Sequence, residues 1–470
     1  MDRRCWRYVS SNFYQTIVRY NNSLVRHCIM CAVNLLLIHI GVMGAWTSPT
    51  LAKLAESDSP IKLSAEQASW VASFLNLTRC FGGIIGPVCV NYLGSKKSIL
   101  ITLCPILLGW LLITLSDSFV WLYFSRLFSG LGLGMTFSVF PLYIGEVSMP
   151  SIRGALISLA TVGAPVGQIL ATLCGSQLSV NEAAYVYLFL AIVTIALFFW
   201  LPESPHHLVK MKKHDAARES IQWYRRGQGV DDELVAVIKF VTTDGDLTFK
   251  EKLQRFKTSK PLQRATAHIM ALYTFVLISG SNVMMMYMEP ILRDANFNLT
   301  DPSLFTVYIN VIATVAAIGS IFLIDRCGRK FLLLVSSIGL SISLLGVMTF
   351  FILVDLNVDT VQWQWLPGVS LLIYMVSFFI GLLPVPNAIL SEIFPANVRS
   401  VASCIAVLTA AFMSFVSIKS YQPMIDAMGH SYVFLFYAIC TVAIIPYSIF
   451  LLPETKGKSL QQIQDELMTH

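Results

Sequence analysis

Charged side chains are scarce in this chain, and their scarcity excludes a soluble protein. Asp, Glu, Lys and Arg make up 13% of the 470 residues, and hydrophobic residues make up 55%. Soluble domains carry about 25% charged residues. Apolar runs of roughly 20 residues, long enough to cross a hydrocarbon core of about 30 Å, recur along the whole chain. Because barrel strands alternate over only about ten residues, the sequence predicts an all-α protein embedded in the lipid bilayer.

Twelve apolar runs are predicted to cross the membrane as helices. They cover about 28–47, 67–90, 98–115, 119–142, 155–178, 184–201, 266–290, 304–324, 331–354, 368–391, 400–424 and 431–452. This prediction depends on the length of the apolar runs and not on the exact residues at which each run begins and ends.

Basic residues are almost absent from every second loop, where only Lys53, Lys62 and Arg293 occur. Most of the remaining Lys and Arg residues lie in the other loops, in the segment before the first span, in the segment 202–265 and after the twelfth span. By the positive-inside rule, both termini and segment 202–265 are predicted to be cytoplasmic. The net charge of +6 is therefore explained by topology, and no nucleic-acid binding is expected.

Two features at the predicted membrane boundaries bear on localisation. The first 27 residues are basic and polar with no apolar core, so no cleavable signal peptide is expected. Asn298-Leu299-Thr300 is a glycosylation sequon in the predicted outward loop after the seventh span, which makes Asn298 a candidate glycosylation site. Nearly all ten cysteines fall inside spans or on the cytoplasmic side, so free thiols and no disulfide framework are expected.

The second half of the chain repeats the first. The matching segments are NYLGSKK at 91–97 with DRCGRK at 325–330, LPESP at 201–205 with LPETK at 452–456, and Glu146 with Arg153, seven residues apart, with Glu392 and Arg399, also seven apart. Two bundles of six helices in the same orientation are therefore predicted, at 28–201 and 266–452. The segments 1–27, 202–265 and 453–470 are predicted to form the cytoplasmic N-terminus, a linker with short helices and the cytoplasmic C-terminus.

Six motifs occur in a characteristic order. They are RLFSGLGLG, PLYIGEVSMPSIRG, PESP, DRCGRK, SEIFP with a following arginine, and PETKGKSL. Across essentially its full length the chain resembles the sugar porter family of the major facilitator superfamily, and GAWTSPTLAKL is similar to insect trehalose and glucose transporters. The resemblance implies a carrier that works by alternating access, with its site between the two halves. It also implies a plasma-membrane protein that functions as a monomer, takes a small sugar, has no cofactor or metal and is not an enzyme.

The resemblance assigns a set of charged residues to a cytoplasmic gate, which closes when the site faces outward and separates when it faces inward. The residues are Arg126, Glu146, Arg153, Glu203, Asp325, Arg329, Glu392, Arg399 and Glu454. Alternatively, some of them only anchor helix ends. Semi-exposed pairs contribute about 0.2–1 kcal/mol each, so the gate can bias two states without locking either. The first half has Asn91 and Ser95 where the family has aspartate and arginine, which predicts weaker holding there.

The sugar contacts of the family's hexose carriers are largely missing. Thr161 stands where they have a glutamine, and segment 276–282 lacks both glutamines of their QQLSGIN motif, so that Asn282 is the one sugar contact that survives there. Asn387 replaces a tryptophan. The candidate substrate-binding residues are Thr161, Asn282, Tyr287, Asn387, His39 and Arg79. Each lost hydrogen bond removes about 0.5–1.5 kcal/mol, so hexose binding requires other groups to compensate.

The first span contains no carboxylate, although proton-coupled relatives have one there, so facilitated (uniport) movement of trehalose, glucose or a related polyol is favoured. His39 is either a group with a proton role or a hydrogen-bonded packing histidine. Arg79 lies about 18 Å into the second span, on one face with Gly82, Gly83 and Gly86, so it should face protein and not lipid. Neighbouring carbonyls and water could satisfy it, or it could bind an organic anion or sugar acid. A non-transporting sugar sensor is a further alternative.

Overall fold

The computed structural model describes residues 29–56, 59, 61–148, 162–225, 229–244, 249–394, 396–456, 458 and 462, and these residues form helices and short connections without a strand. The first half contains the helix at 29–45 followed by α2 (Thr47–Leu54), α3 (Ala65–Leu93), α4 (Ser95–Thr114), α5 (Phe119–Val147), α7 (Gly163–Gln177) and α8 (Val180–Trp200). Short helices follow: α9 (Pro205–Lys210), α10 (His214–Arg225), α11 (Val230–Asp244) and α12 (Phe249–Thr258).

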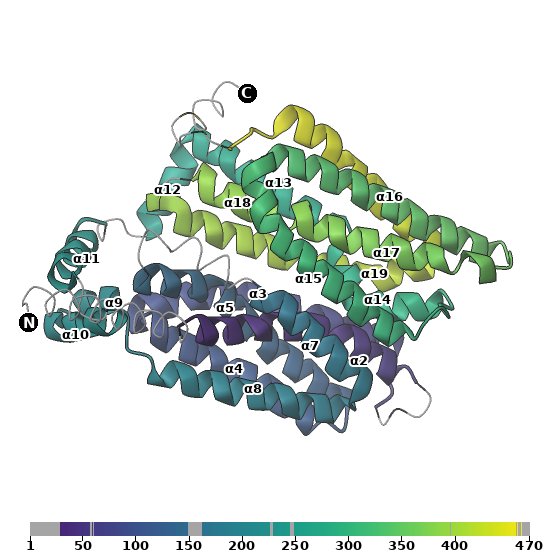
Figure 1. The fold of residues 1–470 in the computed structure, drawn as a ribbon, viewed down its shortest axis with the longest axis horizontal. Coiled ribbons are helices and arrows are strands. Elements are labelled where there is room, and N and C mark those ends of the chain that lie inside the picture. The colour runs from purple at the N-terminus through teal and green to yellow at the C-terminus, as the bar shows by residue number, and fades with distance from the viewer. Residues whose placement is uncertain are drawn as a thin grey trace, which may run out of the picture.

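The second half continues from α13 to the end of η3. Its helices are α13 (Lys260–Ile278), α14 (Ser281–Asp294), α15 (Pro302–Cys327), α16 (Arg329–Asp355), η1 (Val361–Trp363), α17 (Trp365–Ser377), η2 (Phe378–Leu382), α18 (Pro384–Ile393), α19 (Ala396–Pro446) and η3 (Tyr447–Leu451). In Figure 1 the two halves form separate bundles that lie side by side, and α9, α10 and α11 project from one end. We call this end the linker end, and the opposite end, where α2 and α14 lie, the distal end.

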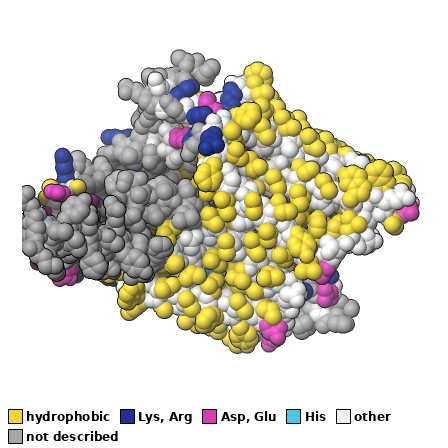
Figure 2. All heavy atoms as spheres, in the orientation of Figure 1, with side chains coloured by type: hydrophobic (Ala, Val, Ile, Leu, Met, Phe, Trp, Pro, Cys, Tyr) yellow, Lys and Arg dark blue, Asp and Glu magenta, His cyan; other side chains and the backbone are white. Residues whose placement is uncertain are grey.

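The prediction of a twelve-helix membrane fold is confirmed. Ten stretches among the described residues are long and apolar enough to cross a membrane. One of them, Val401–Leu451, contains two spans, because the backbone leaves the helical conformation at Gly429, with φ of 78° and ψ of 167°. The described part of α7 is 15 residues long and supplies the remaining span. Figure 2 shows the apolar side chains spread over the body of the molecule and the charged ones gathered toward its two ends, as a bilayer requires.

Three of the predicted spans are interrupted. The first breaks at Trp46, between the helix at 29–45 and α2. The seventh breaks between α13 and α14 at Gly280, which has a φ of 81° that a side chain would strain. The tenth changes from α17 through the π-helical turn η2 to α18. Discontinuous helices of this kind form the sites of many transporters, because their breaks place free backbone and polar groups in the interior.

Close packing in the first bundle depends on glycine. A Cβ atom on Gly41 would lie 1.8 Å from the carbonyl oxygen of Ala164, and one on Gly167 would lie 2.1 Å from that of Ile38. The first helix and α7 can therefore approach only because these positions lack side chains. This contact places the next residue of α7, Gln168, at the boundary between the bundles.

The two bundles meet mainly along three helix pairs, α3 with α19, α7 with α15, and α2 with α14, and α5 also contacts α19. Each pair joins one helix from the first half with one from the second. The interface between these pairs is the region in which the repeat predicts a site.

Candidate functional site

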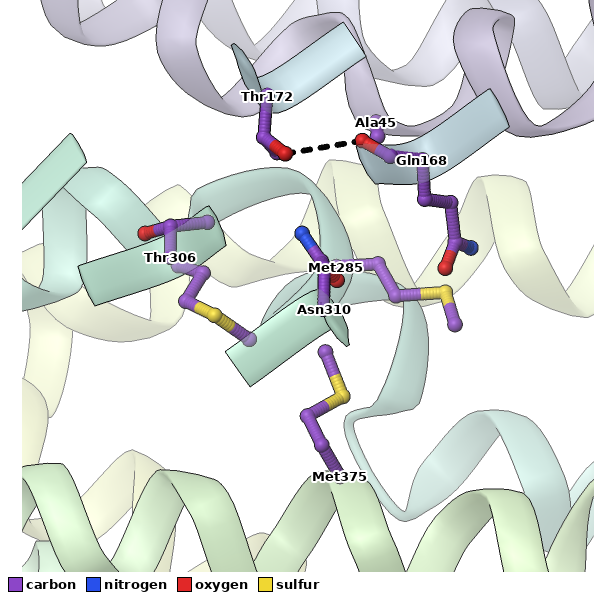
Figure 3. A pocket seen from close by; sticks show the side chains of 8 residues that line it. Ala45, Gln168, Thr172, Met285, Thr306, Asn310 and Met375 are labelled. Atoms are coloured by element: carbon purple, nitrogen blue, oxygen red, sulfur yellow. Dashed lines mark hydrogen bonds between the residues drawn. The ribbon is translucent and has the colours of Figure 1, made fainter. Parts of the chain in front are cut away.

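A small cavity lies at the interface between the bundles (Figure 3). Its lining comes from both halves: Ala45, Gln168 and Thr172 from the first, and Met285, Met288, Thr306, Asn310 and Met375 from the second. The polar members belong to α7 and α15, and the methionines belong to α14 and α17. The cavity is therefore polar on two helices and apolar on two others. Its volume of about 10 Å³ has room for about one water molecule, so a sugar can enter only when the bundles move apart.

The polar lining residues differ in which of their hydrogen-bonding groups are free to contact a ligand. The Thr172 hydroxyl donates to the carbonyl of Gln168 at 3.0 Å, and the Thr306 hydroxyl donates to that of Pro302 at 2.9 Å. Both hydroxyls are thus partly used by their own helices. Within the described part of the chain, the side-chain amides of Gln168 and Asn310 make no hydrogen bond. These two amides, one from each bundle, are free to donate to and accept from a ligand.

The predicted substrate-binding residues do not line this cavity. Asn282 donates to the Ser414 hydroxyl at 3.0 Å within the second bundle. Tyr287 is buried and packs on Tyr421, with 4.9 Å between ring centroids. Thr161 lies outside the described residues.

Two other predicted substrate contacts also lie elsewhere. His39 is fully buried, and its Nε2 lies 3.4 Å from the Thr194 hydroxyl of α8, so it faces the interior of its own bundle. Asn387 accepts a hydrogen bond from the Tyr273 hydroxyl at 2.6 Å and donates to the Leu383 carbonyl at 3.2 Å. Their assignment to substrate stays a prediction.

Arg79 lies where the glycine face of α3 meets protein, as the sequence predicted. A Cβ atom on Gly82 would lie 2.1 Å from the carbonyl oxygen of Leu131 in α5, and one on Gly83 would lie 3.0 Å from Val407 in α19. The Arg79 guanidinium carbon lies 4.5 Å from the centroid of the Phe137 ring.

Sequence reasoning missed Gln168, Thr306 and Asn310. Gln168 lies seven residues after Thr161 in the sequence, and Thr306 and Asn310 are one turn apart on α15. A search for polar residues that share one face of an apolar span would have found them. Met285 also lines the cavity.

At the linker end of the first bundle, two predicted gate residues contact the start of α4. The Ser95 hydroxyl donates to Oε2 of Glu146 at 2.6 Å, and the Lys96 backbone N–H donates to Oε1 of Glu203 at 3.3 Å. The Lys96 ammonium donates to the Phe199 carbonyl at 3.1 Å. These contacts hold the start of α4 against the ends of α5 and α8.

The second bundle repeats this arrangement at the start of α16. Arg329 Nη2 donates to Oε1 of Glu392 at 2.6 Å, and Glu454 accepts from the backbone N–H groups of Arg329 and Lys330 at 3.2 and 3.1 Å. The Lys330 ammonium donates to the Ile449 carbonyl at 2.7 Å. The two clusters thus confirm the internal repeat. The carboxylate of the second is paired with a charged arginine, whereas that of the first accepts from the uncharged hydroxyl of Ser95.

Several predicted gate residues cannot be joined to these clusters. Arg153 lies outside the described residues, and the side chains of Asp325 and Arg399 are likewise outside them. Arg126 lies near the start of α5, toward the distal end, and is fully buried. Its guanidinium carbon lies 3.9 Å from the Trp46 ring centroid. The prediction of Arg126 in a linker-end gate is therefore corrected, because Arg126 lies in the part of α5 that is far from the linker end.

A further set of contacts joins the bundles at the distal end. Arg293 of α14 pairs with Glu56, which follows α2, at 3.1 Å and with Glu289 at 3.0 Å. Glu289 also accepts from the Ser303 hydroxyl at 2.6 Å, and its backbone N–H donates to the Ser48 hydroxyl of α2 at 3.0 Å. We call these five residues the distal latch, because they connect α14 of one bundle to α2 and its following turn in the other.

Comparison with known proteins agrees with this architecture. Residues 28–467 match the family model described as "Sugar (and other) transporter". A facilitated trehalose transporter of Bombyx mori is 31% identical over 438 residues, covering 93% of this chain and 85% of the relative. One of Aedes aegypti is 30% identical over 432 residues, covering 91% of this chain but only 53% of the relative.

Solved structures share the fold. The xylose transporter XylE from E. coli in an inward-open conformation aligns with a TM-score of 0.75 at 20% identity, covering 94% of this chain and 99% of that one. XylE as a proton:xylose symporter of the major facilitator superfamily, bound to 6-bromo-6-deoxy-D-glucose, aligns with a TM-score of 0.72 at 19% identity, covering 95% and 100%. The chain therefore belongs to the sugar transporter family and has the twelve-helix fold of the major facilitator superfamily.

Proposed function

We propose that the protein is a facilitative carrier that moves a sugar such as trehalose, glucose or a related polyol across a membrane by alternating access. The observation that carries this proposal is the pair of free amides, Gln168 and Asn310, which face one cavity from opposite bundles. A sugar hydroxyl both donates and accepts hydrogen bonds, as a side-chain amide does. Binding between the halves lets a rocking motion change access without moving the site within either bundle.

The contacts at the two ends are consistent with one state of such a cycle. At the distal end the latch joins the bundles, and Trp70 of α3 packs near Phe415 of α19 with 6.3 Å between ring centroids. At the linker end the Glu146–Ser95 and Glu392–Arg329 contacts each lie within one bundle. The distal end is thus held closed by contacts between the bundles, whereas the linker-end contacts named here join helices of the same bundle.

We place the linker end in the cytoplasm and the distal end outside a plasma membrane. The basic loops support this orientation, and the sequon residue Asn298 is exposed in the turn after α14, at the distal end. The ranges 28–201 and 266–452 serve as the two moving units, with the monomer as the functional form.

Uniport fits the first helix, whose described residues 29–45 contain no carboxylate that could carry a proton with the sugar. His39 contacts α8 inside the first bundle, away from the cavity. A packing role is the simpler account of this side chain.

The proposal is tested with the purified full-length chain in proteoliposomes. Uptake of radiolabelled trehalose and glucose should be saturable and unchanged by an imposed pH gradient. Gln168→Ala and Asn310→Ala should each weaken apparent affinity by about 2- to 13-fold, since each removes about 0.5–1.5 kcal/mol. Thr409→Val, which removes a hydroxyl bonded to its own helix at Ile405, is the control. Saturable binding without uptake would favour a sensor, and uptake driven by the pH gradient would overturn uniport.

A further inference from the structure

Arg79 is a charged residue at the centre of the molecule that the proposed sugar cavity does not use. It is the midpoint of α3: fourteen residues separate it from Ala65 and fourteen from Leu93, or about 21 Å in each direction. A charge at this depth costs about 2.5–3.5 kcal/mol or more on insertion scales. A side chain retained at such a cost has a function or a compensating partner.

The surroundings of Arg79 show that it faces the interface between the bundles. Gly83, one turn further along the same face, lies against Val407 of the second bundle. Phe137 of α5 stacks on the guanidinium at 4.5 Å, which orients its plane. Aromatic stacking leaves the edge of the guanidinium, with its N–H donors, free to meet a ligand.

The guanidinium has no partner of its own. Within the described part of the chain, Arg79 makes no hydrogen bond or ion pair, and its Nε is buried without an acceptor. This answers the possibility, open from the sequence, that neighbouring carbonyls satisfy it. A buried donor without an acceptor is costly, so a bound acceptor would relieve the site.

Polar groups of the second bundle lie opposite. Tyr273 of α13 is close enough to interact electrostatically with Arg79. Its hydroxyl is held by Asn387 of α18 at 2.6 Å. The Tyr273 oxygen can still accept one hydrogen bond, and the Asn387 amide has a second N–H to donate. These neutral groups suit hydroxyls and do not neutralise the guanidinium.

We propose that Arg79 binds a carboxylate group carried by a sugar, as in a uronic or aldonic acid, with Tyr273 and Asn387 contacting hydroxyls of the same molecule. This rests on the proposed carrier function and adds a second binding position between the bundles, apart from the cavity of Gln168 and Asn310, that selects for acidic sugars. A guanidinium presents two parallel N–H groups that match the two oxygens of a carboxylate, whereas a single hydroxyl accepts from only one. An acidic sugar therefore gains more from Arg79 than a neutral one does.

Binding is measured first, by ligand-induced thermal stabilisation of the purified full-length chain with D-glucuronate, D-glucose and succinate. Glucuronate should bind at least about tenfold more tightly than glucose or succinate. Arg79→Gln should remove that advantage, and Arg79→Lys should retain part of it. Arg218→Gln is the matched control, because it removes one positive charge from an exposed pair with Asp231 in the linker helices.

Each outcome decides the proposal. Equal binding of glucuronate and glucose by the wild type overturns it, and so does an equal loss of both in Arg79→Gln. Equal binding of succinate overturns the sugar part. If Arg79→Gln does not fold, the proposal is decided by the preference of the wild type for glucuronate over glucose and by the part of that preference that Arg79→Lys retains. Uptake into proteoliposomes separates this result from the carrier function. Specific glucuronate binding with no uptake of any sugar rejects the carrier function and keeps the Arg79 site. Glucose uptake with no preference for glucuronate keeps the carrier function and rejects the Arg79 site.

Discussion

The distal latch should set how often the carrier opens away from the linker end. Only two of its contacts cross between bundles: the Arg293–Glu56 ion pair at 3.1 Å and the hydrogen bond from the Glu289 N–H to Ser48 at 3.0 Å. The Arg293–Glu289 and Ser303–Glu289 contacts lie within the second bundle, so they survive opening. Breaking a crossing contact therefore destabilises the closed state alone.

The two crossing contacts should differ in strength. The Glu56 side chain is 53% exposed and that of Arg293 is 39% exposed, so solvent and salt screen the pair, and Glu56→Gln should cost about 0.2–1 kcal/mol. This shifts the open-to-closed ratio by about 1.4- to 5-fold. Ser48 is 1% exposed, and Ser48→Ala should cost about 0.5–1.5 kcal/mol, or about 2- to 13-fold.

The assay measures how fast a membrane-impermeant thiol reagent, added from the distal side, modifies a cysteine at position 168 in the Gln168→Cys variant. The rate measured without that substitution is subtracted, and the latch substitutions are made in the Gln168→Cys background. Glu56→Gln should raise this rate modestly, and the effect should vanish at high salt. Ser48→Ala should raise it more and independently of salt. Lys53→Gln is the control, because Lys53 donates to the Leu178 carbonyl within its own bundle. Unchanged labelling in Ser48→Ala would refute the latch.

Other predictions concern the linker end. Arg329→Gln should destabilise its bundle more than Ser95→Ala does, because it removes a charged partner of Glu392, whereas Ser95 offers Glu146 only an uncharged hydroxyl. Thermal unfolding of the two variants measures this, and equal losses would contradict it. Burial would raise the pKa of Glu454, but backbone N–H donors outweigh it and lower that pKa, so its contribution to stability should be present above the ordinary carboxyl pKa and lost as pH falls through the lowered value. Glu454→Gln should flatten the unfolding temperature between pH 6 and 3 relative to wild type, and an unaltered pH profile would exclude this role.

Much of the fold could be read from the sequence because the bilayer imposes it. Apolar run length predicts helices that satisfy their own backbone groups, and all twelve are accounted for among the described helices. The repeat was visible in the spacing of the matching motifs, and the backbone repeats as well. Gly94 and Gly328 have φ of 88° and 91° and precede the matching helices α4 and α16. Local sequence determined these features, since each depends on residues that are near one another in the chain.

The binding region could not be predicted in the same way. The sequence proposed Asn282 and His39, and each of them contacts its own bundle. Motif position identifies a helix but not the direction in which a side chain points, since one step along a helix turns a residue by about 100°. Gln168 and Asn310 face one cavity because of how α7 and α15 pack.

Arg79 shows the division most clearly. The sequence alone determined that a charge lies in the middle of an apolar span and on the same face as three glycines. Only the tertiary structure decided what surrounds it: Phe137 from its own bundle, Tyr273 from the other, and no carboxylate among the described residues. Depth in the membrane is a property of position along one helix, whereas a partner depends on which helices meet, and that is set by packing between segments nearly two hundred residues apart.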